Sequence, residues 1–493
     1  MSKTKLTILI LIILSIGVGV VSGIYFYTQQ STKNIESTPT DKTIFGGVGN
    51  VRTDLPSDNT NSVENQDNNT IDKPTSTTTP KTPALRMITA GPISGADFVI
   101  RDIVASSTPT YTGTTTASTS SSSKNKKTTV IKPKILGQEE KIRYIERGTG
   151  KIYETASSTN TNERITNSTY TRINEAFFDK KGNNVLMRGL LGNSDVIQTR
   201  YGTSSLDTPT STIMSLKTKE LPYNLLSVVL SPEKDYFAYY TEQKGVGSSI
   251  NISRLDGTGV FNVYKSPFRE WLLSYPNKDT LILNTKPSAY SEGFAYSINI
   301  KNKVFKRLTG GQAGLTTLVS PDGLNVLVGE SIEGSMKLSV LNLKTQSSKD
   351  IYIRTMPEKC VWSILEKNTL FCSAGESIVY APYPDAWYQG LVFFNDNVWK
   401  INTETMENKL VYVIKNSVKE GIDVVNPILN KNEDYLIFTN KKDLSLWGLQ
   451  IEKPQKATST SSTKSIKNSS SKMSTSTKAK AKAKATSTAT STR

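Results

Sequence analysis

Two stretches decide the fold, LLSVVLSPEKDYFAYY (225–240) and TTLVSPDGLNVLVG (316–329). Each reads as an apolar strand, a polar turn with Ser-Pro and a second apolar strand, a pattern that predicts a β-hairpin. Similar hairpins recur along the chain, at 174–189, 271–284, 361–372 and 424–438. Four of the turns are spaced by 44, 45 and 46 residues, centred near Ser231, Tyr275, Ser320 and Glu366. A repeat of ~40–45 residues is typical of a β-propeller, whose blades are four-stranded antiparallel sheets.

The second half of the unit also recurs. Segments 142–155, 296–309 and 338–353 each read as strand, polar turn and strand, and we interpret all three as outer hairpins of a blade. Seven units of about 45 residues need about 315 of the roughly 340 that can fold, so we predict seven blades, with six as the alternative. The expected starts of the blades are near Ala96, Asn174, Leu225, Trp271, Leu315, Val361 and Val424.

Residues 86–89 (RMIT) indicate how the two ends of the propeller domain pair. They match Arg164–Thr166 and Arg307–Thr309, which end outer strands, but they precede the first complete unit. We therefore predict that 86–89 supply the fourth strand of the last blade. Pairing the two ends of the domain would remove an open sheet edge.

The turn Ser-Pro-Asp-Gly at 320–323, its variant at 231–235 and Arg-Leu-Thr at 307–309 resemble the TolB-type, WD-like propeller repeats. The resemblance covers about residues 85–450. It implies an all-β propeller used mainly for protein or glycan contacts. Some members of the family carry a serine-hydrolase domain after the propeller, where this sequence has a low-complexity segment, so that activity is not implied here.

Residues 6–27 (LTILILIILSIGVGVVSGIYFY) carry no charge. At ~1.5 Å per residue a helix of this length reaches about 33 Å, enough to cross a bilayer. Lys3 and Lys5 precede it, so we predict a single-pass anchor of the cell membrane with residues 1–5 in the cytoplasm and the rest extracytoplasmic. The alternative is a cleaved signal peptide, with Val21-Ser22-Gly23 as its cleavage site, which also exports the propeller.

Three polar stretches are too poor in apolar residues to bury a core, and we predict that they are disordered. They are a stalk at 28–84, an insertion at 106–129 within the 85–450 propeller, and a basic tail at 451–493. The tail holds ten Lys or Arg and one acid, Glu452, and so carries about half of the formal net charge of +17. It is either a solvated end or a non-specific contact for polyanions; alternating Lys and Ala gives no means of reading a nucleic-acid sequence.

The chain contains no histidine. This excludes a Ser-His-Asp or Cys-His nucleophile and a His-ligated metal, so we predict no catalytic residue, no metal site and no cofactor. The two cysteines, Cys360 and Cys372, flank one hairpin symmetrically about residue 366. Opposite positions on paired strands suit a disulfide in an exported domain, and two buried free thiols are the alternative.

The segment least like the repeat is 379–399 (VYAPYPDAWYQGLVFFNDNVW), after the second strand of the sixth blade. Aromatic side chains beside an acid on a loop are typical of a sugar or peptide platform. The candidate binding residues are therefore Tyr383, Asp385, Trp387 and Tyr388. The alternative is a long loop that packs its aromatic rings onto the propeller.

The sequence therefore favours a membrane-anchored extracytoplasmic β-propeller that binds or scaffolds an envelope protein or glycan. One alternative is a histidine-independent hydrolase or lyase of envelope glycans, working through carboxylates such as Asp385. Another is a wall- or polyanion-tethering protein that acts through the Lys-Ala tail.

Overall fold

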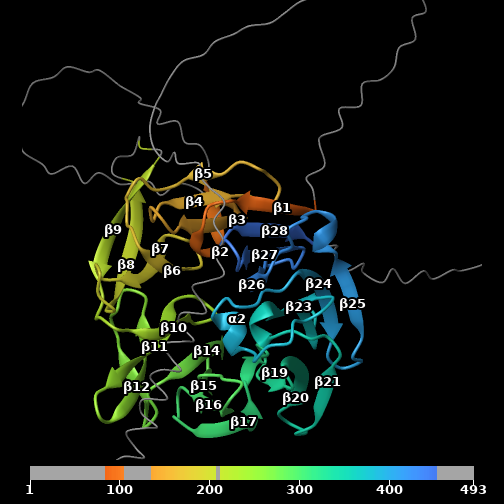
Figure 1. The fold of residues 1–493 in the computed structure, drawn as a ribbon. Coiled ribbons are helices and arrows are strands. Elements are labelled where there is room, and N and C mark those ends of the chain that lie inside the picture. Colours follow the sequence, from red (N-terminus) through yellow and green to blue (C-terminus); the bar gives the residue numbers. More distant parts are fainter. Residues whose placement is uncertain (1–83, 105–134, 207–210, 212, 452–493) are drawn as a thin grey trace, which may run out of the picture. The chain divides into compact units, whose positions relative to one another are not determined.

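The structure, a computed structural model, describes residues 84–104, 135–206, 211 and 213–451 of the 493. Within these ranges 28 strands form seven antiparallel sheets of four strands each. Figure 1 shows the sheets arranged in chain order around a common centre. The predicted all-β, seven-bladed propeller is therefore confirmed, and the six-bladed alternative is excluded.

The first four blades use consecutive strands, each of which pairs with the next. Blade 1 comprises β2 (Ile93–Val104), β3 (Ile135–Glu146), β4 (Ile152–Thr155) and β5 (Glu163–Arg164). Blade 2 comprises β6 (Ile173–Phe178), β7 (Asn184–Leu190), β8 (Ile197–Leu206) and β9 (Met214–Glu220). Blade 3 comprises β10 (Leu226–Leu230), β11 (Tyr236–Gln243), β12 (Gly247–Arg254) and β13 (Phe261–Ser266). Blade 4 comprises β14 (Trp271–Asn277), β15 (Thr280–Thr285), β16 (Glu292–Asn299) and β17 (Phe305–Ala313).

The last three blades complete the ring. Blade 5 comprises β18 (Thr316–Val319), β19 (Asn325–Ile332), β20 (Ser335–Asn342) and β21 (Ser348–Ile351). Blade 6 comprises β22 (Cys360–Trp362), β23 (Thr369–Gly375), β24 (Asp396–Asn402) and β25 (Asn408–Tyr412). Blade 7 comprises β26 (Val424–Leu429), β27 (Tyr435–Asn440), β28 (Leu446–Gln450) and β1 (Leu85–Thr89). The helices among the described residues are α2 (Asp385–Tyr388) and the 3-10 turns η1 (Pro357–Lys359) and η2 (Ile414–Asn416).

The predicted closure is confirmed. Strand β1 pairs antiparallel with β28, with Leu85 opposite Leu449, and the Gln450 amide donates to the Ala84 carbonyl at 2.7 Å. The predicted blade starts lie within three residues of the observed first strands. One interpretation was wrong: segment 142–155 forms strands two and three of blade 1 (β3 and β4), because the outer strand of this blade is the two-residue β5.

The recurring Ser-Pro turn has a defined geometry. In blade 5 the Ser320 hydroxyl accepts from the Asn325 amide at 2.9 Å, and Gly323 adopts a φ of 71°. Blade 7 builds the same turn with an amide side chain: Asn430 Oδ1 accepts from the Tyr435 amide at 2.9 Å. A short polar side chain that accepts from the backbone five residues later thus explains why turns of different sequence share one shape.

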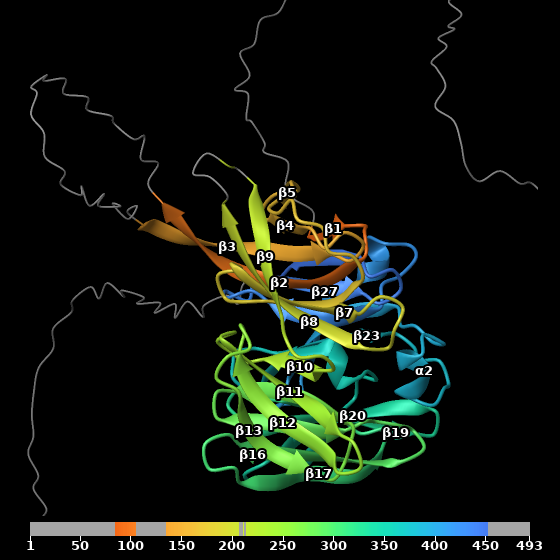
Figure 2. The same cartoon turned by 90° about the vertical axis from the view of Figure 1, so that its left-hand side faces the viewer.

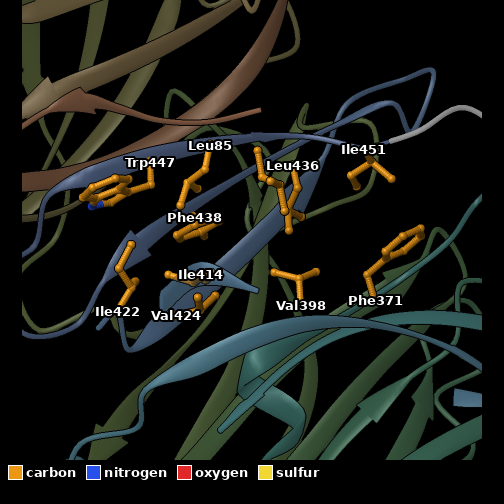
Figure 3. Close-up of a cluster of buried hydrophobic side chains, with 11 residues drawn as sticks. Leu85, Phe371, Val398, Ile414, Ile422, Val424, Leu436, Phe438, Trp447 and Ile451 are labelled. Carbon is orange, nitrogen blue, oxygen red and sulfur yellow. The ribbon is translucent and has the colours of Figure 1, made fainter. Parts of the chain in front are cut away.

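Seven clusters of buried apolar side chains fill the seven interfaces between neighbouring blades. The second strand of a blade lies between two neighbours and is buried on both faces, as β19 and β23 illustrate. This is why these strands read as continuous apolar runs. Figure 3 shows the cluster between blades 6 and 7, in which Phe371 and Val398 face Leu436 and Phe438.

Successive antiparallel strands reverse direction, so the connections alternate between two faces of the ring. We call "turn face" the one with the turns between strands one and two and between strands three and four. The "loop face" carries the connections between strands two and three and those between blades. In Figure 2, α2 lies on the loop face at the right, and the ends of β2 and β3 lie on the turn face at the left. Ala84 and Ile451 are also on the turn face, since the Ile451 amide donates to Asp434 in the β26–β27 turn.

Four predicted segments lie outside the described residues. They are the anchor at 6–27, the stalk at 28–84 except for its last residue, the whole insertion at 106–129, and the tail at 451–493 except for Ile451. Among the described residues, no helix is long and apolar enough to span a membrane.

Candidate functional site

The longest connection on the loop face, among the described residues, is the "aromatic loop", residues 376–395 between β23 and β24. The Ala381 amide donates to the Gly334 carbonyl in blade 5 at 2.9 Å. The Ala289 amide in blade 4 donates to Asp385 Oδ2 at 2.6 Å. The aromatic loop therefore starts in blade 6, crosses blade 5 and is held at blade 4.

Two of the four predicted binding residues, Tyr383 and Trp387, are buried. The Tyr383 hydroxyl donates to the Val379 carbonyl at 2.8 Å, and Trp387 Nε1 donates to Asp423 Oδ2 at 2.9 Å. Both rings belong to a separate apolar cluster beneath the loop, made of Met336, Met356, Ala381, Tyr383, Ala386, Trp387 and Phe394. Burying such side chains stabilises the loop by roughly 1.5–3 kcal/mol each. These two rings pack in the way the alternative interpretation of the segment describes.

The other two residues, Asp385 and Tyr388, lie nearer the surface. Asp385 is half-buried and Tyr388 is 42% exposed. The Tyr388 hydroxyl donates to Glu358 Oε1. Burial raises the pKa of the Glu358 carboxyl. The four residues thus meet in one turn of chain around α2, and their role in binding stays a prediction.

A buried ion network holds the base of the aromatic loop. Lys359 Nζ donates to Asp396 Oδ2 at 2.7 Å, to Asp423 Oδ1 at 2.5 Å and to the Val424 carbonyl at 2.9 Å. All three charged side chains are fully buried. Burial raises the pKa of Asp396 to about 6, although the Lys359 charge lowers it. Asp423 thus joins Lys359 to Trp387 and couples blades 6 and 7 to the loop.

A second cation, Lys441, lies near Trp387. Its Nζ is 4.9 Å from the centroid of the Trp387 ring and 5.4 Å from that of Phe393. Burial lowers the pKa of Lys441. Cation–π contacts of this kind are worth about 0.5–2 kcal/mol and fix the ring in place.

The loop face carries the exposed tyrosines. In the part of the chain that the structure describes, five tyrosines are strongly exposed, and all five lie in loop-face connections: Tyr223 (49%), Tyr290 (80%), Tyr352 (86%), Tyr380 (83%) and Tyr388 (42%). Tyrosine is enriched in binding surfaces because it offers a large rigid ring with a hydroxyl at low entropic cost.

The predicted disulfide is confirmed. Cys360 lies directly opposite Cys372 in the pairing of β22 with β23, and the two sulfur atoms are bonded at 2.08 Å. Both residues belong to the core between blades 5 and 6, so the disulfide has a structural role there. Over the described ranges, no group of three Cys, Asp or Glu side chains is arranged to hold a metal ion.

Sequence reasoning found the aromatic loop but missed its anchor and its most exposed rings. Lys359 is 37 residues from Asp396 and 64 from Asp423, so no local pattern connects them. Tyr290 and Tyr352 are single aromatic residues in other blades. The signal that could have found them is their position in the repeat, since both fall in connections that the repeat assigns to one face.

No protein-family model matches the sequence, and no curated protein matches it. Among solved structures, TolB from Acinetobacter baumannii aligns over 52% of this chain and 58% of its own length, with 11% identity and a TM-score of 0.35. TolB is one of the proteins that this chain resembles. An oligogalacturonate lyase in complex with manganese (11% identity, 63% of this chain, 85% of its own, TM-score 0.43) and the tricorn protease (10%, 63%, 32%, 0.41) are also similar. The strand pairing itself establishes the seven-bladed ring, and the manganese and the enzymatic activities are those of the similar proteins.

Proposed function

We propose that this protein is an extracytoplasmic binding or scaffolding module, anchored in the cell membrane, whose loop face engages an envelope protein or glycan. One observation carries the proposal: all five strongly exposed tyrosines among the described residues lie on that face. Aromatic residues that are exposed on a rigid framework are typical of recognition surfaces.

The topology supports this assignment. Whatever precedes Ala84 and follows Ile451 joins the ring at the turn face. An anchor before residue 84 would therefore leave the loop face free for a partner. The seven packed interfaces and the closure by β1 give the loops a rigid base, which lowers the entropic cost of binding.

Site-specific photocrosslinking in intact cells tests the proposal. A photoreactive phenylalanine analogue would replace Tyr290, Tyr352 or Tyr380 in the full-length chain, one position at a time. We expect each of these positions to give the same discrete crosslinked species, because the three connections share one face. Protein and glycan adducts are told apart by protease and glycosidase digestion.

The turn face offers matched controls, since Val304 (57% exposed) and Ile364 (82%) lie there with comparable exposure. The analogue at these two positions should give none of the loop-face species. Crosslinks that are equal on both faces, or confined to the turn face, would refute the assignment of the binding face.

A further inference from the structure

A cavity with a volume of about 570 Å³ lies on the inner side of the ring. The first strands of blades 7, 1, 2 and 3 line it, together with residues of β27 and β28 in blade 7. The aromatic loop, which is anchored at blades 6 and 4, contributes no lining residue. The volume falls within the roughly 300–1,000 Å³ of small-molecule sites.

The walls of the cavity combine apolar and polar surface in similar amounts, with the apolar share slightly larger. Ile93, Ala96, Val228, Val425 and Ile428 line it, together with Phe177 and Phe438. Backbone and side-chain polar groups of Ser94, Asn174 and Asn426 interrupt this surface. A ligand that fills the cavity would therefore bury an apolar body of moderate size.

The charged residues of the cavity leave one cation without an acidic partner. Asp97 pairs with Lys234 at 2.6 Å, and Glu175 pairs with Arg188. Arg147 forms no ion pair with any carboxylate of the described residues. Both acids are thus neutralised, and the charge that remains at the cavity is positive.

Arg147 is also held in place. Its amide donates to the Pro92 carbonyl at 2.9 Å, and Nη2 donates to Asn174 Oδ1 at 2.9 Å. Arg147 lies in the β3–β4 connection, on the loop face. Ile93, at the loop-face end of β2, is four residues before Asp97, so Asp97 lies about 13 Å from Ile93 toward the turn face. The guanidinium therefore stands at the loop-face end of the cavity, and the Asp97–Lys234 pair stands at the other end.

We infer that this cavity binds a small carboxylate with an apolar body. The carboxylate pairs with the Arg147 guanidinium at the loop-face end, and the apolar body packs against Ile93, Val425 and Ile428. A planar guanidinium matches a carboxylate through two parallel hydrogen bonds, and such charge-assisted bonds are about twice as strong as neutral ones. The inference is independent of the proposed function, because it uses no residue of the aromatic loop.

The test is calorimetric titration of the full-length chain in detergent with 4-phenylbutyrate and with its neutral amide, 4-phenylbutyramide. The two probes share one apolar body and differ in charge. We expect the acid to bind and the amide to bind about tenfold more weakly or worse. In Arg147→Gln both probes should bind as weakly as the amide does.

Two further variants make the result decisive. Arg172 is also on the loop face, but its guanidinium donates to Gly192 and Asn193 and does not line the cavity. Arg172→Gln should therefore bind the acid as the wild type does. Ala96→Leu narrows the cavity and keeps Arg147, so it should weaken binding of the acid. The melting temperature of this variant shows whether it is still folded. No binding of the acid up to about 10 mM, equal binding of acid and amide, or unchanged binding in Arg147→Gln or Ala96→Leu would overturn the inference.

Discussion

Removing the buried ammonium of Lys359 should cost more stability than removing any exposed lysine. In Lys359→Met the carboxylates of Asp396 and Asp423 lose a partner at 2.7 and 2.5 Å and stay buried, since both are 0% exposed. Breaking a buried pair from one side costs about 3–5 kcal/mol, because it leaves an uncompensated charge. With about 2.1 cal/mol/K per residue over roughly 330 residues, this predicts a fall in Tm of about 4–7 °C.

The loss should depend on pH with a defined sign. Burial already raises the pKa of Asp396 to about 6, and the Lys359 charge opposes that shift, so the substitution raises the pKa further. A carboxyl whose folded pKa lies above its unfolded value is most favourable to folding when it is protonated. Stability is therefore lost as the pH rises through the folded pKa. We expect the deficit in Tm of Lys359→Met to be small near pH 4.5 and largest above pH 7, where it should reach the fall of about 4–7 °C given above.

Thermal unfolding followed by circular dichroism at both pH values measures the effect. The matched control is Lys415→Met, which removes an exposed ion pair with Glu376, with side chains 58% and 60% exposed. Exposed pairs contribute about 0–1 kcal/mol, so this variant should melt within about 1 °C of the wild type. Equal Tm values for the two variants, or a deficit of Lys359→Met that grows toward low pH, would refute the reasoning.

Three further predictions concern the ring. Cys360→Ser should lower the free energy of unfolding by about 2–4 kcal/mol, since a cross-link over 12 residues is lost. A wild-type Tm that is the same with and without reductant would contradict this. Gly95→Ala should impair folding, because its Cβ would lie 2.1 Å from the Ala176 carbonyl oxygen, whereas Gly148→Ala meets nothing within 4 Å and should behave as the wild type in the same melting assay. Deleting residues 1–89 removes β1 and should cause association in size-exclusion chromatography; a chain lacking only 1–83 should not associate, and equal behaviour of the two would count against closure by β1.

Much of the ring could be predicted because its determinants are local. Each hairpin is specified by an apolar run, a turn and a second run, so blade starts fall within three residues of the observed strands. The closing strand was also readable, since residues 86–89 repeat an outer-strand pattern and precede the first unit. Blade 1 was harder, because its fourth strand is reduced to Glu163–Arg164 and its repeat is correspondingly faint.

The candidate site was less predictable because its contacts are distant in sequence. The aromatic composition of the loop was visible, but composition does not say which rings point inward. Asp423 decides this for Trp387 by accepting its Nε1 hydrogen, and Asp423 in turn depends on Lys359. The most exposed ring of the loop, Tyr380, lies against Gly334 of blade 5, a contact that only the folded ring brings about.

The bonds of the loop-face carboxylates bear on the choice between binding and glycan cleavage. Hydrolysis of a glycosidic bond needs two carboxyl groups that are free to exchange protons or attack, about 5–10 Å apart. Here Asp385 accepts a backbone amide at 2.6 Å, Glu358 accepts the Tyr388 hydroxyl, and Asp396 and Asp423 neutralise Lys359. Each of these four carboxylates stabilises the aromatic loop, so using one in chemistry would loosen the surface that holds the substrate. The same bonds would suit a binding face, because Glu358 holds the Tyr388 hydroxyl and Asp385 holds the backbone next to Tyr290 before any partner binds.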